Sequence, residues 1–417
     1  MTPATALPFL VRAGRLLLEY NESTASIHRE LRATSTALVG KPCDVAVSYG
    51  GIAVTFPGEL PAFEAVHELH YNSALLERVH SLLSQIRQQR VPLDDALDSL
   101  QNVESLASRH STGLLALLLG LAASALCALL GGDSGGTAIV GVSTALGLLV
   151  RKELGRSHVA PLALPFAAAV IGALLGGFAV RRGWTQTPQL AVMVPALMLV
   201  PGAHFLNGLF DLVDNHVPMG MARLGLAGGI LTAIALGVVV GVRVTLPEGL
   251  SEGAPRTDHL NLIADMLLAG VATSGFAAFY NTPWRSLGLA IVGGMIGHGV
   301  RFLSLESGAH LEIATFFGSL TVGFIAARLS RSSRVPVAVV AFAGAVTMMP
   351  GLTMFRALGG VLQLARERGP GANLETVAAT LGSASQATLA VGALALGLIL
   401  GARATRILRA APLSPRT

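Results

Sequence analysis

The chain has 417 residues, of which 52% are hydrophobic and only 13% are charged. A soluble protein carries about a quarter charged residues, so this composition excludes an ordinary soluble enzyme and indicates a protein largely buried in a lipid bilayer. The net charge of +5 does not indicate nucleic-acid binding, because the basic residues lie at the ends of apolar runs, where they fix membrane topology.

The N-terminal segment is the part of the chain with an ordinary content of charged residues. Apolar residues at helical spacing predict two helices within 9–39, and an alternating pattern predicts a β-hairpin over 44–56. Two amphipathic helices are predicted after it, over 61–90 and 92–108. We therefore expect residues 1–110 to form a small cytosolic α+β domain, or a layer that packs on the membrane part, without a metal site or a cofactor.

Long apolar runs follow, each close to the ~20 residues that a helix needs to cross a bilayer. They divide into a first membrane half, 111–250, and a second membrane half, 251–410. The expected fold class is an α-helical polytopic membrane protein. The ten candidate spans are 113–131, 135–150, 159–180, 189–210, 225–246, 262–281, 286–305, 309–328, 335–358 and 376–402.

The distribution of Lys and Arg predicts the orientation of these spans. With the N-terminus inside, twelve Lys and Arg residues fall on the inner side of the membrane part and eight on the outer side. Positive residues favour the cytoplasmic side. We expect a multi-pass protein of the bacterial inner membrane with both termini cytoplasmic, the 183–188 loop outside and the 329–334 loop inside.

An internal repeat relates the two halves at an offset of about 150 residues. Arg151 ends the second span and Arg301 the seventh, and Pro201-Gly202 in the fourth span matches Pro350-Gly351 in the ninth. Five spans per half is an odd number, so the second half must cross the membrane in the opposite sense. The sequence therefore predicts an inverted 5+5 repeat, which secondary transporters use to build a midplane site.

The paired Pro-Gly dipeptides predict two broken helices. Proline removes an amide hydrogen and frees the carbonyl four residues earlier, here those of Leu197 and Val346. A new helix start exposes amides that attract a carboxylate, while free carbonyls suit an ammonium group, and an α-amino acid carries both. A plain proline kink is the alternative. The predicted substrate-binding residues are Pro201, Gly202, His204, Asn207, Pro350, Gly351, Thr353 and Arg356.

Ionisable residues within spans are costly in a membrane and are functional candidates. Asp265, Glu312, His298 and Asp211 are the candidates here for taking up and releasing a proton during transport. For each of them the alternative is a residue near a span end, at the membrane interface. No Walker A motif is present, so the sequence gives no support to ATP-driven transport.

Short motifs in a fixed order connect the chain to a known family. They are Arg12-Ala13-Gly14-Arg15 and Asp44-Val45-Ala46-Val47 in the N-terminal segment, Pro201-Gly202, Asn207-Gly208 and Asp211-Leu212 in the first half, and Asp265, Asn281-Thr282-Pro283, Gly297-His298-Gly299, Glu312 and Met349-Pro350-Gly351 in the second. With these motifs, nearly the whole chain resembles the threonine/serine exporter family of bacterial membrane proteins. The resemblance implies export of small hydrophilic metabolites, driven by the proton motive force.

The leading interpretation is a secondary active exporter of threonine- or serine-type amino acids, and not an enzyme. One alternative is a dicarboxylate (succinate) exporter, because the resemblance extends to a related two-component system in which the halves are separate proteins. Another is a membrane-anchored hydrolase, for which no nucleophile–base pair is recognisable. The expected partners are a small-molecule substrate and the bilayer, with a homo-oligomer left open and no nucleic acid.

Overall fold

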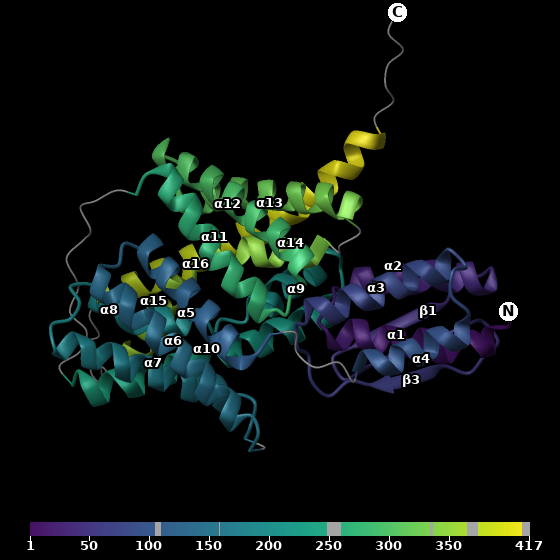
Figure 1. Ribbon diagram of the computed structural model, residues 1–417, viewed down its shortest axis with the longest axis horizontal. Helices are drawn as coiled ribbons and strands as arrows, with labels where there is room; N and C mark the ends of the chain where they lie inside the picture. Colours follow the sequence, from purple (N-terminus) through teal and green to yellow (C-terminus); the bar gives the residue numbers. More distant parts are fainter. Residues whose placement is uncertain (105–109, 158, 248–259, 334–336, 365–373, 411–417) are drawn as a thin grey trace, which may run out of the picture.

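The computed structural model describes residues 1–104, 110–157, 159–247, 260–333, 337–364 and 374–410. It divides into a small N-terminal domain and a larger bundle of apolar helices, the membrane part (Figure 1). Among the described residues, eight helices are long and apolar enough to cross a membrane. Two bent helix pairs raise the number to ten if each pair forms one span. The predicted fold class, a helical polytopic membrane protein, is confirmed.

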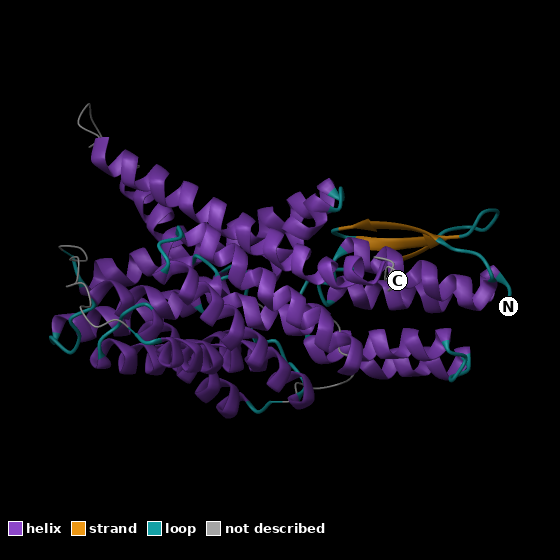
Figure 2. Cartoon of the chain, turned by 90° about the horizontal axis from the view of Figure 1, so that it is seen from above, coloured by secondary structure: helices purple, strands orange, loops and turns teal. Residues whose placement is uncertain are grey.

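The N-terminal domain contains four helices and one three-stranded antiparallel sheet of order β1-β2-β3. The sheet packs against α1 and α2, and α3 and α4 cover the other side of these helices (Figure 2). The elements are α1 (Pro3–Glu19), α2 (Thr24–Val39), β1 (Asp44–Ser48), β2 (Gly51–Thr55), β3 (Ala62–Ala65), α3 (Ser73–Arg87) and α4 (Leu93–Glu104).

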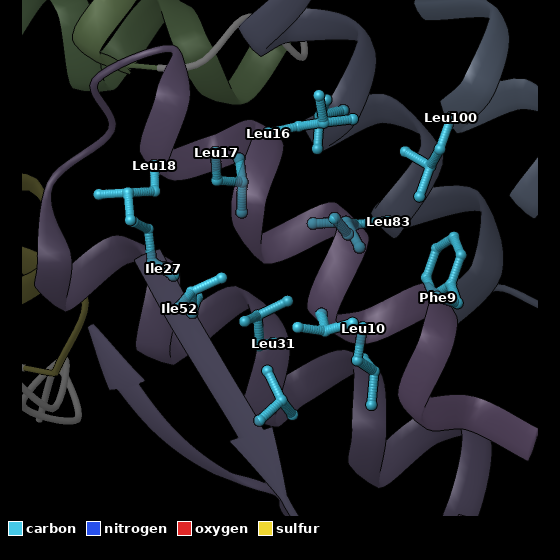
Figure 3. Packing of buried hydrophobic residues seen from close by; sticks show 14 of the residues in the cluster. Phe9, Leu10, Leu16, Leu17, Leu18, Ile27, Leu31, Ile52, Leu83 and Leu100 are labelled. Carbon is cyan, nitrogen blue, oxygen red and sulfur yellow. The ribbon is translucent and has the colours of Figure 1, made fainter. Parts of the chain in front are cut away.

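The core of this domain lies between the sheet and the helices. Leu10, Leu17 and Ile27 of the first two helices and Ile52 of β2 are fully buried in it (Figure 3). Gly14 sits where α1 crosses the sheet, since a Cβ atom there would lie 2.7 Å from the Ile52 side chain. The two predicted helices and the predicted hairpin are therefore present, and they are held together by apolar burial.

One prediction for this domain is wrong. The expected helix over 61–90 begins only at Ser73, and its first part is instead the strand β3 followed by an irregular segment. Ala62 to Ala65 pair with Gly51 to Val54 of β2, and the periodicity of residues 61–72 alone does not show this pairing. The helix expected over 92–108 corresponds to α4, and its predicted end at Ser108 lies outside the described residues.

The membrane part repeats one arrangement of helices twice. The first half contains α5 (Thr112–Leu129), α6 (Ser134–Leu154), α7 (Ala163–Arg181), α8 (Pro188–Leu197), α9 (Gly202–Val213) and α10 (Val217–Thr245). The second half contains α11 (Leu262–Phe279), α12 (Trp284–Glu306), α13 (Leu311–Ser333), α14 (Val337–Ala345), η1 (Val346–Met348), α15 (Gly351–Leu364) and α16 (Leu374–Ala410). The predicted boundary at 250–251 lies outside the described residues.

The two halves share two details that are consistent with a repeat. The turns that end α5 and α11 both place one residue in the left-handed region, Gly131 with φ +88 and Asn281 with φ +56, and in both the next amide bonds to the carbonyl five residues earlier. In addition, α7 packs along α10 through glycines of α10, and α13 packs along α16 through glycines of α16. Small residues allow such close approach of membrane helices.

The N-terminal domain sits at one end of the membrane part, which we call the proximal end, and the opposite end is the distal end (Figure 1). The turn after α11 contacts the domain, since the Ser73 amide donates to the Tyr280 carbonyl at 2.8 Å. Helix α16 returns to the proximal end, where Arg403 pairs with Asp214. At the distal end, Thr185 of the predicted outer loop donates to Asp133 at 2.6 Å.

Candidate functional site

The two broken helices cross each other in the middle of the membrane part. The first bends by 63° between α8 and α9, and the second by 57° between η1 and α15. A Cβ atom on Gly202 would lie 2.9 Å from the Met349 sulfur, and one on Gly351 would lie 2.8 Å from a Leu197 methyl group. Each glycine therefore lies against the opposite break, and the absence of a side chain at both positions allows the crossing.

Most backbone groups at the breaks are already satisfied. The carbonyls of Leu197 and Val346 were expected to be free, but they accept from the amides three residues later, at 3.2 and 3.1 Å. The His204 amide donates to the Pro201 carbonyl at 3.1 Å. These carbonyls are thus used within tight turns and are not presented to a cation. Within the described residues, the amides of Ala203 and Leu352 have no hydrogen-bond acceptor.

A cavity of about 590 Å³, the distal cavity, lies on one side of the crossing. Its wall includes η1 and the start of α15, together with residues from the distal ends of α5, α11 and α12. Its lining includes four polar side chains that are buried or half-buried: Asp265, His298, Arg301 and Thr347. Its volume falls in the range of small-molecule sites, roughly 300–1,000 Å³.

Asp265 and His298 form a hydrogen-bonded pair in this cavity. The Asp265 carboxylate and the His298 Nδ1 atom are 2.6 Å apart, and both side chains are buried. The Arg301 Nε atom and the Thr347 hydroxyl are buried without a hydrogen-bond partner among the described residues. Buried polar groups are normally paired. The cavity therefore offers a carboxylate–imidazole pair that can exchange a proton, beside donors with no partner in the part of the chain that the structure describes.

A second cavity of about 360 Å³, the proximal cavity, lies on the other side of the crossing. Residues 198–204 of the first break line this cavity on the side of the crossing. Residues 67–71 of the N-terminal domain line it at the proximal end. Arg151 also lines it, with its guanidinium 5.8 Å from the centre of the Phe279 ring. The repeat-related arginines Arg151 and Arg301 thus line one cavity each.

Two predicted residues, Asp211 and Asn207, hold the N-terminal domain in place. The Asp211 carboxylate accepts from the Thr24 amide at 2.9 Å and pairs with Arg223 at 2.9 Å, and neither charged side chain is exposed. Asn207 donates to the Asn21 carbonyl. With both carboxylate oxygens engaged in structural bonds, Asp211 lies in a docking contact and lines neither cavity.

The turn between α1 and α2, which contributes Asn21 to this docking contact, carries another buried acid, Glu22. This turn lies outside the membrane helices. Burial alone would raise the pKa of the Glu22 carboxyl, but the hydrogen bond and the charge of His80, 2.8 Å away, outweigh it and lower that pKa. Arg223 donates to the Glu22 backbone carbonyl at 2.5 Å. Charged groups of the N-terminal domain and the first membrane half thus meet in one network.

The domain also contacts the second half. The Asn281 amide group donates to the Asn72 side chain at 3.1 Å, and Glu77 accepts from Ser286 at 3.1 Å and pairs with Arg285. The N-terminal domain therefore bridges the two membrane halves at the proximal end.

The remaining predicted residues are dispersed. His204 lines the proximal cavity and lies 3.4 Å from the Asn21 amide group. The Thr353 hydroxyl donates to the Pro350 carbonyl at 2.7 Å. Arg356 is exposed and approaches Gln189 at 3.5 Å, and Glu312 is half-buried in the first turn of α13. Thr353, Arg356 and Glu312 line neither cavity.

Sequence reasoning assigned no site role to Arg151, Arg301, Arg223 or Thr347. The two repeat-related arginines were interpreted as loop charges that fix topology, although their spacing already marked them as a pair. Arg223 is fully buried within α10. Thr347 gives no local signal, because a threonine in an apolar run is ordinary.

The close crossing predicts a cost for side chains at the breaks. We expect Gly202→Leu or Gly351→Leu to destabilise the protein by about 1–3 kcal/mol, because the new Cβ atoms meet the opposite break. Thermal unfolding of the purified variants measures this. Gly225→Leu is the matched control, since a Cβ atom there has nothing within 4 Å. Equal unfolding temperatures for Gly202→Leu and Gly225→Leu would contradict a tight crossing.

Comparisons with known proteins agree over nearly the whole chain. A family model described as a putative threonine/serine exporter matches residues 8–245, and a second, described as a threonine/serine exporter, matches residues 265–403. A threonine/serine exporter of Corynebacterium glutamicum is 24% identical over 427 residues, covering 98% of this chain and 84% of the relative. No solved structure matches. With both membrane halves matched, this multi-pass membrane protein belongs to the threonine/serine exporter family.

Proposed function

We propose that this exporter moves threonine- or serine-type amino acids out of the cell in exchange for protons, and that substrate and proton bind in the distal cavity. The observation that carries the proposal is the buried Asp265–His298 pair beside Arg301, whose Nε atom has no hydrogen-bond acceptor among the described residues. Ionisable residues at membrane depth are characteristic of proton and substrate pathways.

The charges of the distal cavity fit a zwitterion. Arg301 offers donors for an α-carboxylate, and Asp265 offers an acceptor for an α-ammonium group. A dicarboxylate has no ammonium group that could pair with Asp265, and each of its two carboxylates requires a cation in the site. Arg356, which the sequence suggested as an additional cation, is exposed and outside the cavity. We therefore prefer an amino acid to succinate as the substrate.

Competition for Asp265 provides the coupling. When Asp265 is ionised it attracts the substrate ammonium group, and when a proton from outside neutralises it this attraction is lost and the substrate leaves. His298, 2.6 Å from the carboxylate, passes the proton to or from it. The inverted repeat supplies the conformational change, because rocking one half against the other exposes a site near the midplane to alternate sides.

The orientation belongs to the same proposal. The N-terminal domain and the described end of α16 lie at the proximal end of the molecule. We place this end in the cytoplasm, in the inner membrane of a bacterium, because the excess of basic residues falls on it. The distal cavity then faces the outside, where proton binding promotes substrate release.

Counterflow into proteoliposomes tests the substrate class. Vesicles loaded with unlabelled threonine are expected to accumulate labelled threonine and serine, whereas vesicles loaded with succinate should accumulate neither. An acid interior imposed on the vesicles should change the rate of threonine movement if protons are exchanged for it. Accumulation of labelled succinate without accumulation of amino acids would reject the proposed substrate and favour the dicarboxylate alternative.

A further inference from the structure

The proximal cavity is lined by a half-buried arginine, Arg151. Arg151 lies in the last turn of α6, and its side chain makes no hydrogen bond or ion pair with any described residue. Its guanidinium contacts the Phe279 ring, which leaves the hydrogen-bond donors available. A cation at this position in a membrane protein is costly unless something pairs with it. A ligand with a carboxylate would provide that partner.

The N-terminal domain contributes the opposite charge. Glu68 lies in the segment between β3 and α3 and lines the same cavity as Arg151. Its charge acts on Arg151, but the two side chains are not within ion-pair distance among the described contacts. A cation and an anion therefore face the same space of about 360 Å³ without contacting each other. That arrangement leaves room for a ligand between them.

The floor and wall of the cavity complete the site. The first helix break provides the floor at Pro201 and Gly202, and next to it the Ala203 amide has no acceptor within the described part of the chain. Phe276 and Tyr280 form an apolar wall. A small apolar surface with a few convergent polar groups is typical of a small-molecule site.

We propose that the proximal cavity is a second binding site for a zwitterionic α-amino acid, in which Arg151 binds the α-carboxylate and Glu68 binds the α-ammonium group. This inference rests on the proposed export function and adds to it an entry site that the N-terminal domain helps to build. Because Arg151 and Arg301 are repeat-related, the substrate meets an equivalent carboxylate anchor on each side of the crossing. The N-terminal domain then takes part directly in substrate binding.

Substrate analogues with single charges removed test these two roles. Proteoliposomes with the proximal end facing the bath would take up labelled threonine, with threonine, threonine amide or N-acetylthreonine as competitors. For the wild type we expect threonine to compete at least about tenfold better than either analogue, because each loses one charge-assisted interaction. Arg151→Gln should weaken the binding of threonine about tenfold and reduce its advantage over threonine amide only, because Arg301 in the distal cavity still recognises a carboxylate. Glu68→Gln should reduce the advantage of threonine over N-acetylthreonine only.

Matched variants separate binding from folding. Arg182→Gln is the arginine control, since Arg182 also stacks on a phenylalanine, Phe178, but lies at the distal end. For Arg182→Gln, the three competitors should inhibit uptake of labelled threonine as they do for the wild type. Arg151→Lys keeps the charge and should keep the preference for threonine over threonine amide.

Two results would overturn the inference, and they can be told apart. In the first, the wild type transports threonine, but Arg151→Gln and Glu68→Gln either weaken competition by all three compounds by the same factor or leave it unchanged. The proximal site is then rejected, and the export function stands. If the wild type takes up no labelled amino acid from the proximal side, the proposed function itself fails.

Discussion

Asp265→Asn is expected to abolish export driven by a proton gradient while exchange of substrate across the membrane continues with lower affinity. Asparagine has nearly the same volume and still reaches His298, so the buried contact at 2.6 Å can be kept. It cannot bind and release a proton, and it offers the substrate ammonium group no charge. Loss of one charge-assisted interaction lowers affinity by about tenfold to a hundredfold.

The measurement compares gradient-driven export with counterflow in the same vesicles. Glu312→Gln is the matched control, because Glu312 is half-buried and lines neither cavity. We expect it to export at close to the wild-type rate. If Asp265→Asn exports like the wild type with an unchanged pH dependence, the proton site is elsewhere. A selective loss in Glu312→Gln would assign the proton site to that residue.

The second large effect concerns stability. Arg223→Leu should destabilise the protein by about 3–5 kcal/mol, because it leaves the Asp211 carboxylate buried without its cation. The Glu22 carbonyl would lose its donor as well. Denaturant or thermal unfolding of the purified protein gives the difference. The double variant Arg223→Leu with Asp211→Leu should recover much of the loss, since an apolar pair replaces a buried charge pair at little cost.

The other docking contact supplies the control for this measurement. Arg285 pairs with Glu77, but 72% of the Arg285 side chain is exposed. Glu77 is buried, but it also accepts from Ser286, and water screens the exposed guanidinium, so Arg285→Leu should have a smaller effect than Arg223→Leu. Equal destabilisation by Arg223→Leu and Arg285→Leu would show that burial of the first pair is not what makes it important.

The features that could be predicted from the sequence depend on neighbouring residues. A proline followed by glycine breaks a helix wherever it occurs in an apolar run, so both breaks and their repeat were predicted. The use of the freed carbonyls was not, because tight turns after Leu197 and Val346 satisfy them locally. A helix was also expected over 61–72, where residues 62–65 instead pair with β2 and an irregular segment follows.

The candidate site required information from residues distant in the sequence. Asp211 fitted a proton site as well as Asp265 did, since both are acids in apolar surroundings. Asp211 is bound by the Thr24 amide and the Arg223 guanidinium. Asp265 instead contacts His298 and lines an open cavity. Thr24 lies 187 positions from Asp211, and no local pattern indicates such a contact.

The bridging position of the N-terminal domain has a thermodynamic consequence. The domain is in effect a tethered ligand with two binding faces, one on each membrane half, and a covalent tether makes its effective concentration high. A ligand that fits one arrangement of two bodies increases the population of that arrangement. In the proposed mechanism, rocking the halves apart at the proximal end would release one face, so the binding energy of the domain would help to set how often the transporter opens there. Any molecule that binds the free domain would then change the transport rate without touching the substrate path.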